Sequence, residues 1–213
     1  MKTDDLIRGL AADLGARPRP HARPLWADLV AATVVMAIPP FAAIWFGLSR
    51  NPHLAHGPGL TLGVTLAAAG LLAAGGLAAA ARAGRPDAGF RWRWAAVPAV
   101  LLAVGIAVEL LRGGTAGWLP RLIGDQPLAC YSLVFLFSLP MLGGMLLALR
   151  RGAPVRPRAA GAVAGLAAGG LAAAMYMLHC PEGSLLFIAT WHVPAVLSAA
   201  AVGAWAGGRV LRW

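Results

Sequence analysis

The sequence predicts an all-α protein, a polytopic six-transmembrane-helix bundle with a short cytoplasmic N-terminal amphipathic helix. Three observations support this fold class. Hydrophobic residues make up 59% of the 213 residues and charged residues only 12%, whereas soluble chains carry about 25% charged residues. The apolar residues gather into runs of about 20, the length that crosses ~30 Å of hydrocarbon as a helix. The basic residues are concentrated in every second loop between these runs.

The apolar runs must be helices, because a backbone in lipid has no water to satisfy its N–H and C=O groups. The alternating pattern of membrane barrel strands is absent from the sequence. We expect spans at residues 26–48, 60–81, 94–111, 127–149, 159–178 and 185–208. The chain thus divides into a cytoplasmic N-terminal segment (1–25), a transmembrane domain (26–208) and a short cytoplasmic tail (209–213).

The placement of positive charge supports six spans with both termini in the cytoplasm. Fifteen of the 18 Lys and Arg residues fall in the segments 1–25, 82–93, 150–158 and 209–213. Basic residues collect in loops that stay inside, so the net charge of +10 reflects topology, and we expect no direct contact with nucleic acid. Residues 1–25 lack the apolar core of a signal peptide, and span one should therefore be an uncleaved anchor.

The N-terminal segment predicts a short helix over residues 3–14 that needs a partner. Thr3 is a suitable N-cap, and Asp4 and Asp5 suit the positive end of the helix dipole. Apolar residues then share one face of the helix; they are Leu6, Ile7, Leu10 and Leu14. A helix this short is marginal alone in water. A groove on another protein, the lipid surface, or the loops of its own bundle could cover this face.

The chain contains two cysteines, which the topology places at the same outer, water-facing edge. Cys130 opens span four and Cys180 closes span five. These spans are joined by a short inside loop, so their outer ends should lie side by side. A disulfide requires Cα atoms within about 7 Å, and an oxidising periplasm allows such a bond to persist. A reversible switch, a permanent staple and two unrelated buried thiols all remain open.

Polar residues near Cys180 are candidate auxiliaries to a thiol site. They are His179, Glu182 and His192. Cys130, His179 and Cys180 are candidate ligands for a soft metal, although their spacing differs from that of a structural zinc site. A CxxC motif is missing, which argues against a membrane disulfide oxidoreductase. No cofactor motif is evident, and we expect the protein not to be an enzyme.

Glycines at intervals of four residues predict close helix packing. Gly161, Gly165 and Gly169 form such a row in span five, and Gly203 and Gly207 do so in span six. Rows of this kind let helix backbones approach each other. They favour packing inside the bundle, while a homodimer stays possible and the oligomeric state open.

Several stretches together resemble the NrsF-type family of bacterial inner-membrane anti-sigma factors, which regulate extracytoplasmic-function sigma factors. These are the opening TDDLIRGLAAD, the cysteine before span four and the segment HCPEGSLLFIATWH. The resemblance implies that the N-terminal segment holds a sigma factor at the inner membrane. It implies that Cys130 and Cys180 report periplasmic oxidants or thiophilic metals. The expected sigma-factor contacts are Asp4, Asp5, Leu6, Ile7, Arg8, Leu10 and Leu14.

Two other classes of function compete with this interpretation. A small transporter or channel subunit would need polar groups along a path, but the spans are nearly all Ala, Gly, Leu and Val, with Glu109 as an acid near one outer end. A membrane thiol enzyme would need a cofactor or a paired-cysteine motif. The lipid bilayer and a sigma factor are therefore the expected partners.

Overall fold

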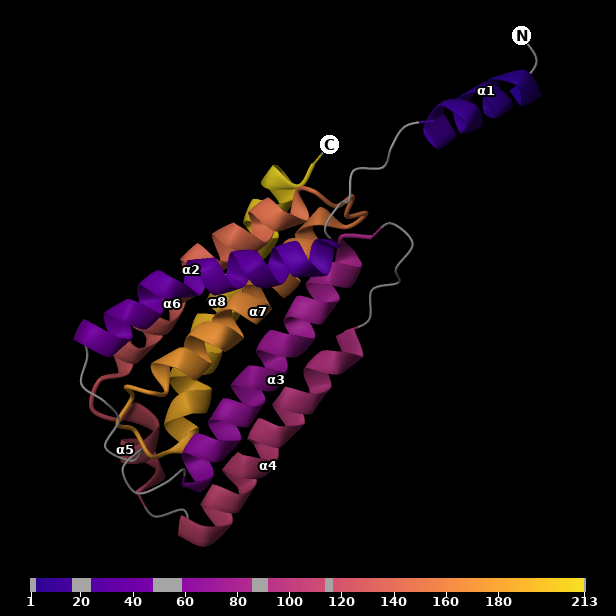
Figure 1. Cartoon of the computed structure of the whole chain (residues 1–213). Coiled ribbons are helices and arrows are strands. Elements are labelled where there is room, and N and C mark those ends of the chain that lie inside the picture. The colour runs from indigo at the N-terminus through magenta and orange to yellow at the C-terminus, as the bar shows by residue number, and fades with distance from the viewer. Residues whose placement is uncertain (1–2, 17–23, 48–58, 86–91, 114–116, 213) are drawn as a thin grey trace.

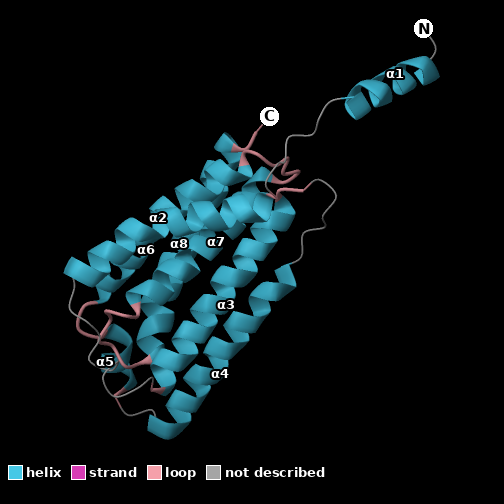
Figure 2. Cartoon of the chain, in the orientation of Figure 1, coloured by secondary structure: helices cyan, strands magenta, loops and turns pink. Residues whose placement is uncertain are grey.

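The computed structural model describes residues 3–16, 24–47, 59–85, 92–113 and 117–212. This part of the chain is helical, with no strand among the described residues (Figure 2). The elements in chain order are α1 (Thr3–Ala16), α2 (Leu25–Gly47), α3 (Leu60–Ala83), η2 (Trp92–Ala95), α4 (Ala96–Gly113), α5 (Trp118–Ile123), α6 (Pro127–Leu149), α7 (Pro157–Tyr176) and α8 (Leu185–Val210).

Six of these helical segments are long and apolar enough to cross a membrane. They are α2, α3, η2 with α4, α6 together with the preceding α5, α7 and α8. Five of them, and α6 taken without α5, begin and end within two residues of a predicted span. Large apolar side chains remain exposed along them, including Val34, Ile38, Phe46 and Val100. Exposed apolar surface of this extent is unusual for a soluble monomer, so the structure has the character of a multi-pass membrane protein.

The sequence did not predict α5, which lies within the expected outer loop 112–126. This helix has only six residues and lies between two glycines with positive φ, Gly117 at 72° and Gly124 at 61°. The indole Nε1 of Trp191 in α8 donates a hydrogen bond to the Leu122 carbonyl at 3.0 Å and ties α5 to the bundle. Such a tertiary contact leaves no hydropathy or periodicity signal in so short a segment.

Helix α7 lies at the centre of the bundle, with α3, α6 and α8 packed around it (Figure 1). In its most apolar stretch 72% of the residues are buried, against 11% for the η2–α4 segment at the periphery. The central helix has the lowest hydropathy of the six and the peripheral one has the highest. This order is opposite to that of a soluble core, because lipid selects apolar outer faces while close packing selects small inner residues.

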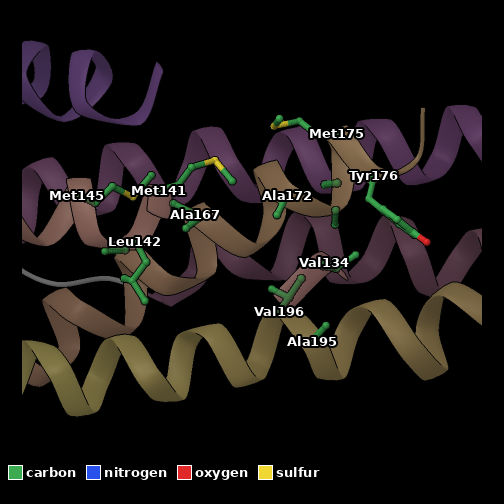
Figure 3. Packing of buried hydrophobic residues seen from close by; sticks show 14 of the residues in the cluster. Val134, Met141, Leu142, Met145, Ala167, Ala172, Met175, Tyr176, Ala195 and Val196 are labelled. Atoms are coloured by element: carbon green, nitrogen blue, oxygen red, sulfur yellow. The ribbon is translucent and has the colours of Figure 1, made fainter. Parts of the chain in front are cut away.

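The glycine rows bring α7 and α8 into backbone contact. A Cβ placed on Gly161 would overlap the Gly203 carbonyl, and one placed on Gly165 would overlap that of Ala199. The prediction that these glycines pack inside the bundle is therefore confirmed. Larger side chains fill the space on the other face of α7, where Met141 and Met145 of α6 pack near Ala167 (Figure 3).

The bundle has two ends of different character. The C-terminus of α8 and the start of α2 lie at one end, as an even number of spans requires, and α1 stands apart from the bundle beyond that end (Figure 1). Arg151 and Asp28 form an ion pair there at 3.0 Å, and the Ala153 amide donates to the Gly84 carbonyl at 3.0 Å. At the opposite end α5 meets the α7–α8 connection, and the two cysteines lie there.

Candidate functional site

Local sequence determines the two helix ends that carry the cysteines, the beginning of α6 and the end of α7. Pro127 occupies the first turn of α6, where its missing N–H is not needed, and Cys130 follows within that turn. Helix α7 ends at Tyr176, and the Cys180 amide still donates to the Tyr176 carbonyl at 3.0 Å. Pro181 cannot continue that pattern. Cys180 is thereby held at the end of α7, beside the beginning of α6.

Cys130, Cys180 and His192 form a compact cluster. The Sγ atoms of the two cysteines lie 3.9 Å apart. These sulfurs and one imidazole nitrogen of His192 all lie within 4.8 Å of one another. The Tyr176 hydroxyl donates to the Cys130 Sγ at 3.5 Å. Three elements of the fold, α6, α8 and the segment after α7, thus each contribute one reactive group.

This thiol cluster is buried, whereas the sequence led us to expect a water-facing edge. The exposed fractions are 2% for Cys130, 0% for Cys180 and 2% for His192. The aromatic rings of Tyr176 and Phe187 approach the imidazole edge-on, with ring centroids 5.8 and 6.2 Å away. The cysteines therefore lie at the expected end of the bundle but under a cover of aromatic side chains.

His192 is unusual because neither ring nitrogen has a hydrogen-bond partner among the described residues, although both are buried. An imidazole always has at least one N–H donor, and its other nitrogen accepts when the ring is neutral. Leaving a buried polar group unpaired costs about 1–3 kcal/mol. The two cysteine sulfurs lie within 4.8 Å of an imidazole nitrogen but are weak hydrogen-bonding partners, so an ion shared with the thiols would satisfy the ring better than the thiols alone.

The cluster can perform two kinds of chemistry. A disulfide requires the sulfurs to approach by about 1.9 Å, to the bonded distance of ~2.05 Å. A shared metal ion requires almost no movement, because ligation at ~2.3 Å places two thiolates roughly 3.8–4.0 Å apart. Two sulfurs and one imidazole are a ligand set suited to a soft ion. The contact with Cys130 and the burial both raise the pKa of the Cys180 thiol, so either reaction must release a proton from it.

The predicted auxiliary residues take different positions. His192 belongs to the cluster, while His179 is not a member of the group with metal-ligand spacing. The His179 ring instead packs edge-on against Tyr176, with centroids 5.4 Å apart. Glu182 accepts a hydrogen bond from the Asp125 amide at 2.9 Å and so joins the α7–α8 connection to the loop before α6. His192 therefore replaces His179 in the candidate ligand set.

Sequence reasoning missed that Glu109 of α4 caps the beginning of α8. Its carboxylate accepts from the Ser184 hydroxyl at 2.7 Å and from the Leu185 amide at 2.6 Å. It therefore caps the N-terminus of α8, where an acid also complements the helix dipole. The two partners lie 75 and 76 positions away in the sequence, so no local motif could reveal the contact.

The N-terminal segment forms helix α1, two residues longer than the predicted helix over residues 3–14. Leu6 and Ile7 are 46% and 58% exposed, and Arg8 pairs with Asp5 at 3.2 Å on the helix surface. The side chains of Leu10 and Leu14 lie outside the described part of the structure. The assignment of this face to sigma-factor binding stays a prediction.

The helical structure shows membrane-spanning character, and sequence comparisons place the protein in the class of anti-sigma factors. The family described as "Negative regulator of sigma F" (NrsF) matches residues 10–213, and the chain belongs to this family. It is 36% identical to the anti-sigma-F factor NrsF of Caulobacter vibrioides (strain NA1000 / CB15N). It is 34% identical to the probable anti-sigma-F factor NrsF of Azospira oryzae (strain ATCC BAA-33 / DSM 13638 / PS). Both matches cover 100% of this chain and 100% of the relative. No solved structure shows a significant match. This membership supports a regulatory protein with a sigma-factor partner.

Proposed function

We propose that the protein holds an extracytoplasmic-function sigma factor at the bacterial inner membrane and releases it when an oxidant or a thiophilic metal reacts at Cys130 and Cys180. The observation that carries this proposal is the 3.9 Å separation of two buried thiols beside an unpaired imidazole. Both termini are cytoplasmic in this proposal, which follows from the distribution of basic residues in the loops. The thiol cluster then faces the periplasmic side.

The exposed apolar face of α1 is the proposed sigma-factor contact. Leu6 and Ile7 are exposed on a helix that stands apart from the bundle (Figure 1). An isolated helix of 14 residues is marginal in water. A sigma factor that offers an apolar groove would bury this face and stabilise the helix. Basic loops at the same end of the bundle, such as the one carrying Arg151, could extend that contact.

Reaction at the cluster would change how α6, α7 and α8 are held together. A disulfide or a shared ion links the beginning of α6 to the α7–α8 connection. Moving a sigma factor from 90% bound to 10% bound requires about 2.6 kcal/mol of differential affinity. A disulfide contributes ~2–4 kcal/mol, so its free energy is sufficient if the cytoplasmic ends of these helices respond. Either formation or loss of the bond could be the releasing event.

The sigma-factor contact can be tested by co-purification in mild detergent. The full chain should recover a sigma factor, and a chain lacking residues 1–24 should not. Ile7→Asp should lose the partner as well, because it places a charge on the apolar face. Ala12→Asp is the matched control, since Ala12 lies on the opposite side of the same helix by its sequence position and is exposed. Recovery by all four chains would refute an α1 contact, and recovery by none would refute the sigma-factor proposal.

The sensor can be tested by replacing each cysteine with serine and measuring induction of the sigma-factor regulon by hypochlorite or copper salts. We expect Cys130→Ser and Cys180→Ser to change induction while the amount of protein in the membrane stays the same. Ser132→Ala is the matched control, because the Ser132 hydroxyl only donates to carbonyls of its own helix at 2.6 and 3.2 Å. Normal induction in the double cysteine variant would refute thiol sensing.

A further inference from the structure

The two cysteines of the thiol cluster are not equivalent, because they lie at opposite ends of their helices. Cys130 is the fourth residue of α6, which begins at Pro127. Helical side chains lean toward the N-terminus, so its sulfur lies near the positive end of the helix dipole, which stabilises a thiolate. Cys180 follows the last turn of α7, where its amide donates to the Tyr176 carbonyl at 3.0 Å. It therefore lies at the negative end of a dipole, which disfavours a thiolate.

The Tyr176 hydroxyl adds a second difference between the cysteines. The Tyr176 side chain is only 2% exposed, and its O–H donates to the Cys130 Sγ at 3.5 Å. A buried phenol normally has a hydrogen-bond partner, and here that partner is a sulfur. A thiol is a weak acceptor, whereas hydrogen bonds to a charged group are roughly twice as strong as neutral ones. The hydroxyl therefore favours negative charge on Cys130.

The surroundings of Cys180 keep that thiol protonated. The contact with the Cys130 sulfur is the largest cause that raises the pKa of Cys180, and burial is the next. The Glu182 carboxylate also opposes a negative charge there, while the Glu182 amide favours one and offsets only part of the rise. With Cys180 protonated, its S–H is the donor in the 3.9 Å contact between the sulfurs. Cys130 then accepts from both Tyr176 and Cys180.

We propose that Cys130 is the sulfur that reacts first with an oxidant, that Cys180 then closes the disulfide, and that Tyr176 is the positioning residue that makes Cys130 the nucleophile. This order of reaction rests on the proposed sensing of oxidants by the cluster. His192 is the base that takes the Cys130 proton, because its nitrogens have no partner among the described residues and one of them lies within 4.8 Å of the sulfur. The cluster thus has separate groups for attack, proton transfer and resolution.

Hypochlorous acid illustrates the reaction. The Cys130 thiolate attacks chlorine, so an S–Cl bond forms and the O–Cl bond breaks. The leaving hydroxide takes the proton from the His192 imidazolium and becomes water. The Cys180 sulfur next attacks the Cys130 sulfur, so the S–S bond forms, chloride leaves and the Cys180 proton passes to His192. The two cysteines together lose two electrons, and hypochlorous acid is reduced to chloride and water.

The test is chemical and uses the purified full chain in mild detergent, without a sigma factor. Hypochlorous acid is added with a fixed excess of free methionine, which competes for the oxidant, so the yield at each cysteine reports its relative rate. The chain is then unfolded in dodecyl sulfate with dimedone, which labels sulfenic acid, and its peptides are analysed by mass spectrometry. We expect Cys180→Ser to accumulate sulfenic acid at Cys130. In Cys130→Ser the yield at Cys180 should be roughly tenfold lower, the equivalent of about 1.4 kcal/mol.

The two tyrosines supply a matched pair of further variants. Tyr176→Phe should lower the yield at Cys130 roughly fivefold and leave the yield at Cys180 in Cys130→Ser unchanged. A purely structural effect would instead loosen the cover and speed the oxidation of both cysteines. Tyr131→Phe is the control, because the Tyr131 hydroxyl shares a 2.8 Å hydrogen bond with Ser198, and it should oxidise like the unchanged chain. Circular dichroism verifies that each variant is folded.

The outcomes separate this order of reaction from the sensing function itself. An equal or higher yield at Cys180 would overturn the order, even if the unchanged chain still forms the disulfide and sensing stands. Equal losses in Tyr176→Phe and Tyr131→Phe would overturn the role of Tyr176. A lack of any disulfide in the oxidised, unchanged chain would overturn the sensing of oxidants and the order of reaction together.

Discussion

Substitution of Gly161 by alanine provides a strong test of the α7–α8 contact. A Cβ at this position would overlap the Gly203 carbonyl oxygen and lie 3.0 Å from the Gly207 Cα. Both neighbours are backbone atoms, so no side chain can rotate away. Because carbon and oxygen atoms need about 3.5 Å, the two helices must separate by roughly 1 Å or more. Overpacking of this kind costs about 1–3 kcal/mol, and we expect the free energy of unfolding to fall by that amount.

The assay is reversible unfolding in mixed detergent micelles, followed by circular dichroism. Gly143→Ala is the matched control, since a Cβ there meets no atom within 4 Å and Gly143 lies within α6, six residues before its end. Alanine is favoured over glycine inside a helix by roughly 0.5–1 kcal/mol, so this control should unfold like the unchanged chain or later. Unaltered stability of Gly161→Ala would refute the close backbone contact. An equal loss in both variants would assign the effect to glycine removal in general.

Three further substitutions test contacts at the two ends of the bundle by the same unfolding measurement. Glu109→Gln keeps the shape of the α8 cap but weakens its charge-assisted hydrogen bonds, and the loss should be about 1–2 kcal/mol; no loss would mean that the cap is dispensable. Trp191→Phe removes the bond to the Leu122 carbonyl and should cost about 1 kcal/mol, with proteolysis near α5 as an independent readout. Asp28→Asn breaks an ion pair whose Arg151 side chain is 72% exposed; a change above about 1 kcal/mol would contradict the weak contribution expected of such a pair.

The spans were predictable from sequence because lipid imposes a rule that every helix must satisfy separately. Length, hydropathy and loop charge are local properties, and each observed span ends within two residues of its predicted position. The positions of the two cysteines at one end of the bundle followed from the same topology. Their sensing role, like the N-terminal contact with a sigma factor, stays a prediction.

The parts that sequence reasoning missed depend on contacts between distant residues. His179 was the candidate ligand because it precedes Cys180, but the turn at the end of α7 directs it against Tyr176. His192, twelve positions after Cys180, reaches the thiols because α8 packs tightly on α7 through the glycine rows. The Glu109 cap and the burial of the cluster likewise arise from helix packing, which hydropathy does not encode.

The depth of the thiol cluster also acts as a size filter on the agents that can react with it. Exchange with glutathione disulfide or a protein disulfide requires a third sulfur to reach one of the thiols, and at exposed fractions of 2% and 0% there is no room for that approach. Hypochlorous acid or a single metal ion is small enough to enter during brief local opening. A protein built in this way would respond to small oxidants or metal ions, and would not react with the larger thiols and disulfides of its compartment.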